Sequence, residues 1–418
     1  MSFFSVTKLA PTLVAPSEPT PSGNLPLSFM DQLPASRFLV DSIHVFGHGQ
    51  EPGMVIKAAL SKALVPYYPV AGRLAMSDQG ELEVACTRDG VWFVEASVDR
   101  SLKDLNHLEL PLAVPKEELL PYLSPEVEKD LIVMMQVTQF SCGGFVVGMR
   151  SSHAMFDGLG AAQFVRAIAD IAKGLAQPMI RPIWCREAIP SPPPKLPSLR
   201  PPPPSLTAHP FVTFLLDISL DRINETKSKF TKETGKYCSK FDILTAKVWQ
   251  SRARAIGLKP GADVRLGFAA NARHLMHQLL PPKGGYYGNC AYPMTITAPS
   301  EKITDSSLFE VINLIREAKE SLGSRFAKWL VGDPEGDPFR VPVDYGLLCF
   351  SDWSRVGFYE VDYGWGQPIH VGPLDDNSFI ASCILLNPPA PKQGVRLITR
   401  CVVEEQLGAF QDQMANLV

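Results

Sequence analysis

The chain has 418 residues, of which 45% are hydrophobic and 20% charged, and its formal net charge is -3. This composition is close to that of an ordinary globular protein, and at about 100–200 residues per domain the length suggests two domains, with three as the alternative. The sequence has neither a basic block that would favour nucleic-acid binding nor an acidic tail. Charge therefore indicates no macromolecular partner.

The sequence also lacks the signals of secretion and membrane insertion. The segment 1–25 is interrupted by prolines and has no apolar core of a signal peptide, and no apolar run approaches the roughly 18 residues of a membrane-spanning helix. The eight cysteines are widely spaced without a C-x-x-C pair, which favours buried free thiols over disulfides or zinc. We therefore expect a cytoplasmic protein that does not bind a membrane.

Strand and helix patterns alternate through the first part of the chain. Asp89-Gly90 stands between two of the predicted strands and favours a hairpin there. The predicted elements are, in chain order, a helix over 55–64, strands over 82–86 and 91–96, strands over 131–140 and 144–149, and a helix over 160–172.

The segment 151–160 joins the last of these strands to the helix and places His153 four residues before Asp157. A strand-to-helix corner presents side chains to a ligand, and a histidine with an ordinary pKa near ~6.5 accepts a proton at neutral pH. Asp157 would orient the imidazole, either directly or by holding the loop. The corner is therefore a candidate catalytic centre.

Two structural interpretations of the same corner stay open at this point. His153 would then be a core histidine with satisfied hydrogen bonds, and Asp157 the N-cap of the following helix. A histidine and an aspartate at this spacing occur together often by chance, so the pair alone does not establish a site. The sequence contains no G-x-S-x-G elbow, phosphate-binding loop or G-x-G-x-x-G fingerprint that would indicate another class of enzyme.

A proline-rich segment, 189–210, divides the chain. Its repeated prolines exclude a helix or a central strand and favour an extended linker, with a ligand for an SH3-type domain as the minor alternative. Mixed elements on both sides predict two α/β domains, 1–188 and 211–418. The elements predicted after the linker are a strand over 211–220, a helix over 239–255, a strand over 264–270, a helix over 308–322, strands over 379–386 and 395–403, and a helix over 404–416.

A second motif, Asp362-Tyr363-Gly364-Trp365-Gly366, lies in the C-terminal part and by itself indicates a tight structural bend. Together with His153–Gly158 it resembles the plant BAHD acyltransferases, which carry H-x-x-x-D-G in mid-chain and D-F-G-W-G near the C-terminus. Further matches occur in order along the chain: Leu27–Asp31 with L-S-x-x-D, Tyr68–Arg73 with Y-P-x-A-G-R, Ser239–Asp242 followed by Trp249, Asn271–Arg273, and Tyr286–Asn289.

The resemblance implies two domains like those of chloramphenicol acetyltransferase, of α/β (α+β) class with mixed sheets and a solvent channel between them. It implies acyl-CoA as a co-substrate, a small alcohol or amine as acceptor, no permanently bound cofactor and no metal. His153 is then the general base, and the indole N–H of Trp353 stabilises the oxyanion, with Ser351 close by. Asp157 is expected to have a structural role through a pair with Arg273.

The remaining site residues also follow from the resemblance. One departure is Gln250, where many members have arginine after the tryptophan, so Arg252 or Arg254 is expected to replace that contact to coenzyme A; Tyr363 in place of phenylalanine is a milder one. The expected substrate contacts are Ser351, Ser28 and Phe156, the expected coenzyme A contacts are Ser239 and Arg252, and the expected structural residues are Arg273, Asp362, Gly364, Trp365 and Gly366.

The resemblance thus predicts a monomeric O-acyltransferase that transfers an aromatic (hydroxycinnamoyl or benzoyl) or short aliphatic acyl group to a small alcohol through a ternary complex. The alternative is an N-acyltransferase that acylates a polyamine or an aryl amine. A non-catalytic relative that only binds a ligand is the third possibility, and the intact His153, Asp157 and Trp353 argue against it.

Overall fold

The computed structural model describes residues 5–33, 36–123, 130–193, 207–281, 284–333, 337–338, 342–374 and 378–417. The chain forms two compact units. Unit 1 comprises Met1–Ser191, Met276–Cys290 and Ser354–Asp375, and unit 2 comprises Pro192–Leu275, Ala291–Trp353 and Asp376–Val418. The division differs from the one predicted at the linker, because 276–290 and 354–375 return to unit 1. Residues 194–206 of the predicted linker lie outside the described residues.

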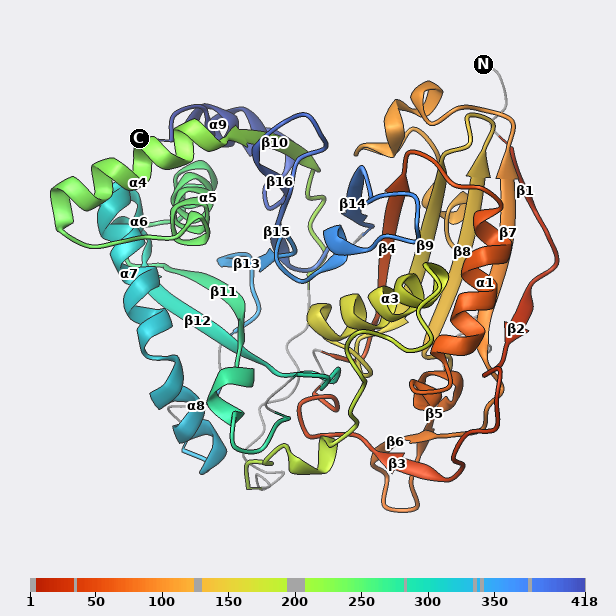
Figure 1. The fold of residues 1–418 in the computed structure, drawn as a ribbon. Coiled ribbons are helices and arrows are strands. Elements are labelled where there is room, and N and C mark those ends of the chain that lie inside the picture. The colour runs from red at the N-terminus through yellow and green to blue at the C-terminus, as the bar shows by residue number, and fades with distance from the viewer. Residues whose placement is uncertain are drawn as a thin grey trace. The chain divides into compact units, whose positions relative to one another are not determined.

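Unit 1 is built on a mixed sheet, to which seven of the described strands contribute in the order β1-β7-β8-β9-β4-β14, with β2 also paired to β7 (Figure 1). The pairs are antiparallel except for the parallel pair of β7 and β8. The predicted strands over 131–140 and 144–149 are β8 and β9, which pair as expected. The bounds are β1 Val6–Lys8, β2 Thr12–Val14, β4 Leu39–Phe46, β7 Val91–Val98, β8 Val133–Phe140, β9 Phe145–Ser152 and β14 His370–Pro373.

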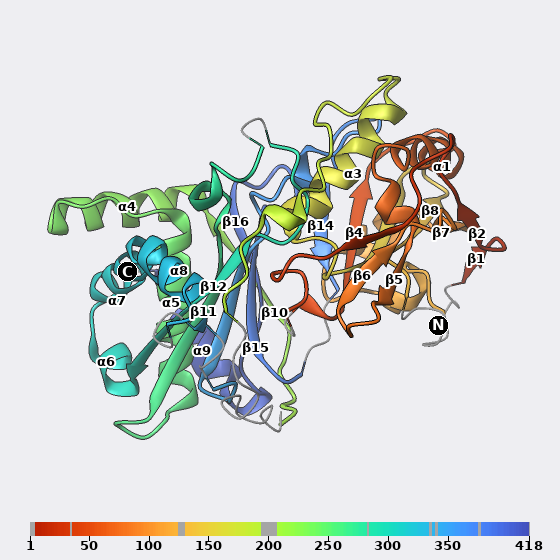
Figure 2. The same cartoon turned by 90° about the horizontal axis from the view of Figure 1, so that it is seen from below.

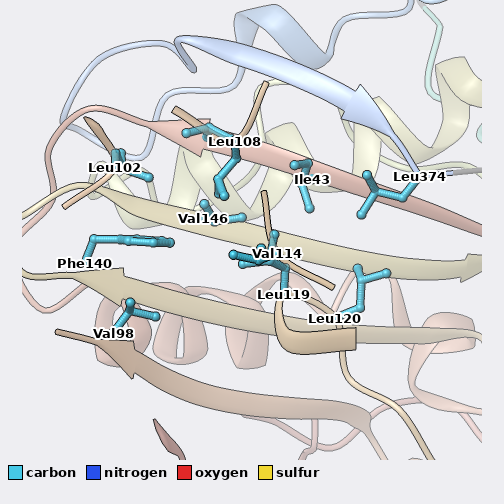
Figure 3. Close-up of a cluster of buried hydrophobic side chains, with 11 residues drawn as sticks. Ile43, Val98, Leu102, Leu108, Val114, Leu119, Leu120, Phe140, Val146 and Leu374 are labelled. Atoms are coloured by element: carbon cyan, nitrogen blue, oxygen red, sulfur yellow. The ribbon is translucent and has the colours of Figure 1, made fainter. Parts of the chain in front are cut away.

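Two helices cover one face of this sheet. They are α1 (Pro52–Ala63) and α3 (Gly158–Ala172), which pack against each other, and Figure 2 shows both on the same side of the strands. The other face carries a buried apolar cluster in which side chains of the strands meet those of the segment 102–120 (Figure 3). Ile43 and Val45 of β4 belong to this cluster. Because side chains alternate along a strand, His44 faces the helical side, where its ring contacts Phe358.

The hairpin predicted at Asp89-Gly90 is wrong. The strand before it, β6 (Leu82–Ala85), pairs with β3 (Asn24–Pro26) and β5 (Arg73–Met76) in a small separate sheet. The strand after it, β7, belongs to the large sheet. The turn therefore carries the chain from one sheet to the other, since long-range pairing partners of each strand outweigh the local turn signal. Short 3-10 helices occur at Tyr68–Ala71, Lys103–Leu108, Lys116–Glu118, Arg186–Ala188, Arg273–Met276 and Phe358–Glu360.

Unit 2 contains a mixed sheet of six described strands in the order β10-β16-β15-β13-β11-β12 (Figure 1). Its helix α5 packs against α4, α6, α7 and α9. The helices predicted over 239–255, 308–322 and 404–416 are present as α5, α7 and α9; α4 and β12 had not been predicted. The bounds are β10 Phe214–Ser219, α4 Leu220–Thr234, α5 Lys240–Ile256, β11 Asp263–Asn271, β12 Ala291–Pro299, α6 Ser300–Asp305, α7 Leu308–Glu320, α8 Leu322–Leu330, β13 Leu347–Asp352, β15 Ala381–Leu386, β16 Gly394–Arg400 and α9 Glu404–Ala415. None of the described helices combines the length and the apolar content needed to cross a membrane.

The glycine–tryptophan motif was predicted in the C-terminal domain, and the structure places it in unit 1. One carboxylate oxygen of Asp362 accepts the backbone N–H groups of Gly364 and Gly366, both at 2.8 Å. These two glycines have φ of +105° and +95°, a region that residues with a side chain rarely adopt. The ring of Tyr363 packs against Phe46 at 5.3 Å between ring centroids. The motif thus fastens the segment that leads into β14.

The hydroxyl of Tyr363 has no hydrogen-bond partner among the described residues, although the side chain is only 2% exposed. Leaving a buried hydroxyl unpaired costs about 1–3 kcal/mol. Tyr363→Phe is therefore expected to raise the free energy of unfolding by about 1 kcal/mol in urea denaturation. Tyr67→Phe is the control with the opposite sign, because the Tyr67 hydroxyl accepts a hydrogen bond from Gln163 at 3.0 Å. A loss of stability in Tyr363→Phe would contradict the assignment.

His44 gives unit 1 a sensitivity to acid. Burial, together with the neighbouring His370, lowers the pKa of His44 to about 3. The unfolded chain, in which a histidine titrates near ~6.5, then binds more protons than the folded chain. The contribution of His44 to the free energy of unfolding is therefore complete above about pH 6.5. It is lost as the pH falls from about 6.5 toward 3, at about 1.4 kcal/mol per pH unit.

His44→Gln should remove this contribution. Between pH 7 and pH 5 the loss in free energy of unfolding is expected to be about 2 kcal/mol smaller in the variant than in the wild type. Urea denaturation at the two pH values measures the difference, which does not depend on whether the substitution itself destabilises the protein. An identical pH dependence in both proteins would show that His44 is not the responsible group.

Candidate active site

The His153 turn connects β9, which ends at Ser152, to α3, which begins at Gly158. Both backbone groups of His153 are bound: its N–H donates to the carbonyl of Phe38 at 2.9 Å, and its carbonyl accepts from the side-chain amide of Asn289 at 2.7 Å. The half-buried imidazole lies against the ring of Phe38, with 5.0 Å between centroids. Nδ1 of His153 is buried and has no hydrogen-bond partner among the described residues. The ring is thus held by packing and by its main chain.

Asp157 closes the turn as the N-cap of α3, which confirms the capping interpretation of this residue. Its Oδ1 accepts from the backbone N–H of Gly160 at 3.0 Å and its Oδ2 from that of Cys290 at 3.1 Å. The carboxylate is 8% exposed. It joins the start of the helix to the segment 286–290, so its role is to fix the turn. The predicted pair with Arg273, a residue of unit 2, stays a prediction.

The helix and the segment 286–290 approach each other too closely for a side chain at one position. A Cβ atom on Gly160 would lie 2.0 Å from the carbonyl oxygen of Tyr287. Only glycine allows this contact, which explains why a small residue stands three positions after Asp157. The close approach brings the N–H of Cys290 within reach of the carboxylate.

A buried ion pair lies beneath the turn. Nη1 of Arg186 is 2.5 Å from Oδ2 of Asp31, and both side chains are 0% exposed. Oδ1 of Asp31 accepts the backbone N–H of Asn289 at 2.9 Å and its side-chain amide at 2.8 Å. Nη2 of Arg186 donates to the carbonyl of Met155 at 2.7 Å. The turn is therefore linked to the charge pair through two of its carbonyl groups.

Aromatic rings surround the guanidinium of Arg186. It lies 4.3 Å from the ring centroid of Trp184 and 5.4 Å from that of Tyr287. Arg186 had not been predicted from the sequence, because no spacing pattern links it to Asp31. The only local signal is a charged residue directly after the apolar stretch 182–185.

Two of the predicted substrate contacts have other surroundings in unit 1. Both the backbone N–H and the hydroxyl of Ser28 donate to Oδ2 of Asp31, at 2.9 and 2.5 Å, and the side chain is buried. The ring of Phe156 is 3% exposed and stacks on Phe164 of α3, with 5.7 Å between centroids. These positions make Ser28 part of the network around Asp31 and Phe156 part of the core, and neither placement favours the predicted contact.

The remaining predicted residues belong to unit 2. Ser351 lies on β13, and Trp353 follows the strand, with its backbone N–H bound to the carbonyl of Leu385. Ser239 is the N-cap of α5 and forms a capping box with Asp242. Their predicted contacts to substrate and coenzyme A stay predictions.

Arg252, predicted to contact coenzyme A, is buried in unit 2, and that contact stays a prediction. Its side chain is 1% exposed, and the guanidinium donates to the carbonyls of Cys401 and Tyr345, at 2.7 and 2.5 Å. The helix turns this position toward the core of unit 2. Arg254, two residues on, is exposed, and its guanidinium donates to the carbonyl of Thr304.

No group of three or more histidine, cysteine, aspartate or glutamate side chains is placed to hold a metal ion in the part of the chain that the structure describes. All eight cysteines are free thiols, and four of them are buried. The His153 turn presents an imidazole whose main chain is firmly held. Proton transfer by a side chain of this kind is general acid–base catalysis.

The family model named "Transferase family" matches residues 4–417. The chain is 48% identical to a myricetin 3-O-glucosyl 1,2-rhamnoside 6'-O-caffeoyltransferase of Crocosmia x crocosmiiflora, over 98% of this chain and 99% of that protein. It is 45% identical to acyl transferase 7 of Oryza sativa subsp. japonica, over 99% and 98% of the two chains.

The fold is similar to that of solved structures. Vinorine synthase matches with a TM-score of 0.73 and 21% identity, over 99% of this chain and 98% of that chain. A TRI101 structure complexed with coenzyme A and T-2 from F. sporotrichioides matches with a TM-score of 0.70 and 16% identity, over 94% and 97%. These neighbours confirm the predicted two-domain fold of the chloramphenicol acetyltransferase type. With the family match and the two plant relatives, they show that the chain belongs to the Transferase family of BAHD acyltransferases.

Proposed function

We propose that this acyltransferase uses acyl-CoA to esterify an alcohol, with a hydroxycinnamoyl or related aromatic acyl group as the donor and a short aliphatic acyl group as a second possibility. The observation that carries the proposal is the similarity over 98% of the chain to a relative named as a caffeoyltransferase. The acceptor is a hydroxyl group on a small plant metabolite. The enzyme is proposed to act as a cytoplasmic monomer, as the family resemblance suggests.

His153 is proposed as the general base. Its Nε2 would take the proton of the acceptor hydroxyl while the oxygen attacks the thioester carbonyl, and the imidazolium would then protonate the departing thiolate. The placement of His153 at a strand-to-helix corner, with both backbone groups bound, supports this role. No covalent acyl-enzyme is required, so donor and acceptor bind together before transfer.

The oxyanion that forms on the thioester carbonyl needs a hydrogen-bond donor. The indole N–H of Trp353 is proposed for this role, with Ser351 as a neighbouring contact to substrate. Coenzyme A contacts are proposed at Ser239, where the N-terminus of α5 adds a favourable dipole for an anion. The burial of Arg252 does not favour the contact predicted there.

Amide formation is the second candidate function. It is favoured by a further relative, a 3'-N-debenzoyl-2'-deoxytaxol N-benzoyltransferase of Taxus canadensis, which is 34% identical over 99% of this chain. The acceptor would then be a polyamine or an aryl amine. His153 would remove a proton from an attacking amine in the same way, so its role as a base does not distinguish amide formation from ester formation.

A panel of acyl-CoAs tests the proposal. Caffeoyl-, p-coumaroyl-, benzoyl- and acetyl-CoA are each incubated with alcohols and amines, and the products are identified by mass spectrometry. Esters of hydroxycinnamic acids are expected. Amides without esters would favour the second candidate, and no product from any pair would contradict the proposal.

His153→Ala is expected to lower kcat for acyl transfer at least about 1000-fold, since general base catalysis is lost along with the ordered contact to the acceptor. Release of free coenzyme A, followed with a thiol reagent, measures the rate. Circular dichroism and the thermal midpoint should stay close to those of the wild type. His48→Ala, at an exposed histidine of unit 1, is the matched control. Wild-type rates in His153→Ala would overturn the mechanism.

Asp157 variants should lose stability before they lose chemistry. Asp157→Ala removes the N-cap, which costs about 1–2 kcal/mol, and also removes the hydrogen bond from the N–H of Cys290. Asp157→Asn keeps one oxygen as an acceptor, so its thermal midpoint is expected to lie between those of the wild type and Asp157→Ala. Activity per folded molecule is compared with the midpoints. A fully stable Asp157→Asn without activity would show that Asp157 takes part in the chemistry.

A further inference from the structure

Two side chains that do not belong to the His153–Asp157 motif bind its main chain. The amide of Asn289 donates to the carbonyl of His153 at 2.7 Å, and the guanidinium of Arg186 donates to the carbonyl of Met155 at 2.7 Å. Each of them also binds Asp31, one at either carboxylate oxygen. Asn289, Arg186, Asp31 and the main chain of the turn are thus connected in one network within unit 1.

We infer that Asn289 and Arg186 are positioning residues for His153, held in place by Asp31. The inference rests on the proposed function of His153 as the general base. The main chain of a residue sets the direction of its side chain. The two bound carbonyls belong to His153 and Met155, which are separated by one residue. A clamp on both carbonyls therefore fixes the tilt of the turn from which the imidazole projects.

The network is built for rigidity. Asp31, Arg186 and Asn289 are all at most 4% exposed, so water does not compete for their hydrogen bonds. Asp31 accepts from two groups of Ser28 and two of Asn289 besides its ion pair with Arg186. A low local dielectric strengthens such bonds.

The segment that carries Asn289 is also held from the other end of the turn. Oδ2 of Asp157 accepts the N–H of Cys290, the residue after Asn289. The turn and the segment 286–290 are therefore joined at two points, at His153 and at Asp157. A displacement of about 1 Å at a reacting group costs on the order of 100-fold in rate, so small shifts of this turn should show in kcat.

Gln163 provides a matched control. It is also an amide, and it donates to the carbonyl of Gly285 at 3.0 Å and to the hydroxyl of Tyr67, so it holds the neighbouring part of the same segment. Among the described residues, neither of these two hydrogen bonds reaches the turn 153–157. A merely structural role of Asn289 would make Asn289→Ala and Gln163→Ala behave alike.

The test compares Asn289→Ala with Gln163→Ala in the full chain, using caffeoyl-CoA and the acceptor that the wild type esterifies. We expect Asn289→Ala to lower kcat at least about tenfold, with the KM of both substrates within about twofold, because the base is misplaced while the binding contacts stay. Gln163→Ala is expected to keep kcat within about twofold. Equal losses in the two variants, or an unchanged kcat in Asn289→Ala, would overturn the inference.

Arg186→Lys tests the second arm of the clamp. Lysine keeps the positive charge beside Asp31 but lacks the second terminal nitrogen, which in Arg186 reaches the carbonyl of Met155. Its kcat is expected to fall at least about tenfold with little change in KM, and Arg186→Met is expected to fold less well, because Asp31 is then buried without its charge partner. Full kcat in Arg186→Lys would remove Arg186 from the set of positioning residues.

A measurement without substrate separates the inference from the proposed function. With histidine labelled at 13Cε1, the signal of His153 is identified by its absence in His153→Ala. The signal is expected to shift in Asn289→Ala but not in Gln163→Ala. If the wild type transfers no acyl group, the proposed function fails while this signal still decides the positioning role; an unshifted signal in Asn289→Ala contradicts it.

Discussion

The arrangement of unit 1 depends on one charge pair that is fully withdrawn from water. A carboxylate and a guanidinium in the interior lose their hydration, and this loss is offset only where every remaining lone pair and N–H group finds a partner. Asp31 accepts from Ser28 and Asn289, and the guanidinium of Arg186 lies beside the rings of Trp184 and Tyr287, although its Nε has no hydrogen-bond partner among the described residues. The carbonyls of the His153 turn are among the partners that complete the network. The geometry of the candidate base is thus tied to the solvation of an ion pair beneath it.

The members of this buried network come from segments that are far apart in the sequence. Asp31, the turn at 153–157, Arg186 and the segment 286–290 come from four distant parts of the chain and meet in one buried volume. The close approach at Gly160, where a Cβ would touch the main chain of Tyr287, has the same origin. Each of these segments carries one part of the network, so its role cannot be recognised from that segment alone.

Local pattern predicted much of the fold, and long-range packing decided the rest. The helix α3 and the strand pair β8–β9 follow from apolar periodicity, and Asp157 was open to a capping interpretation because caps are local. The Asp89-Gly90 hairpin failed because the partners of both flanking strands lie elsewhere in the chain. Spacing along a helix also does not tell which of its faces is buried, and Arg252 lies on a buried face. Almost nothing in the sequence indicates that Arg186 belongs to the site, since no pattern links it to Asp31, 155 positions earlier. The burial of both residues is a property of the folded chain.

The return of the segment 354–375 to unit 1 has a consequence for synthesis on the ribosome. Strand β14 pairs with β4 along His370–Pro373, and the Asp362 motif packs beside it. Until residues 370–373 have emerged, β4 presents an unpaired edge, and the partners of the His153 turn at 286–290 are made only after residues 192–275 of unit 2. Such edges are sites of aggregation. Unit 1 therefore cannot complete its folding before the C-terminal part of the chain has been synthesised. A fragment that ends at the proline-rich segment would lack both β14 and the segment 286–290, which binds the His153 turn.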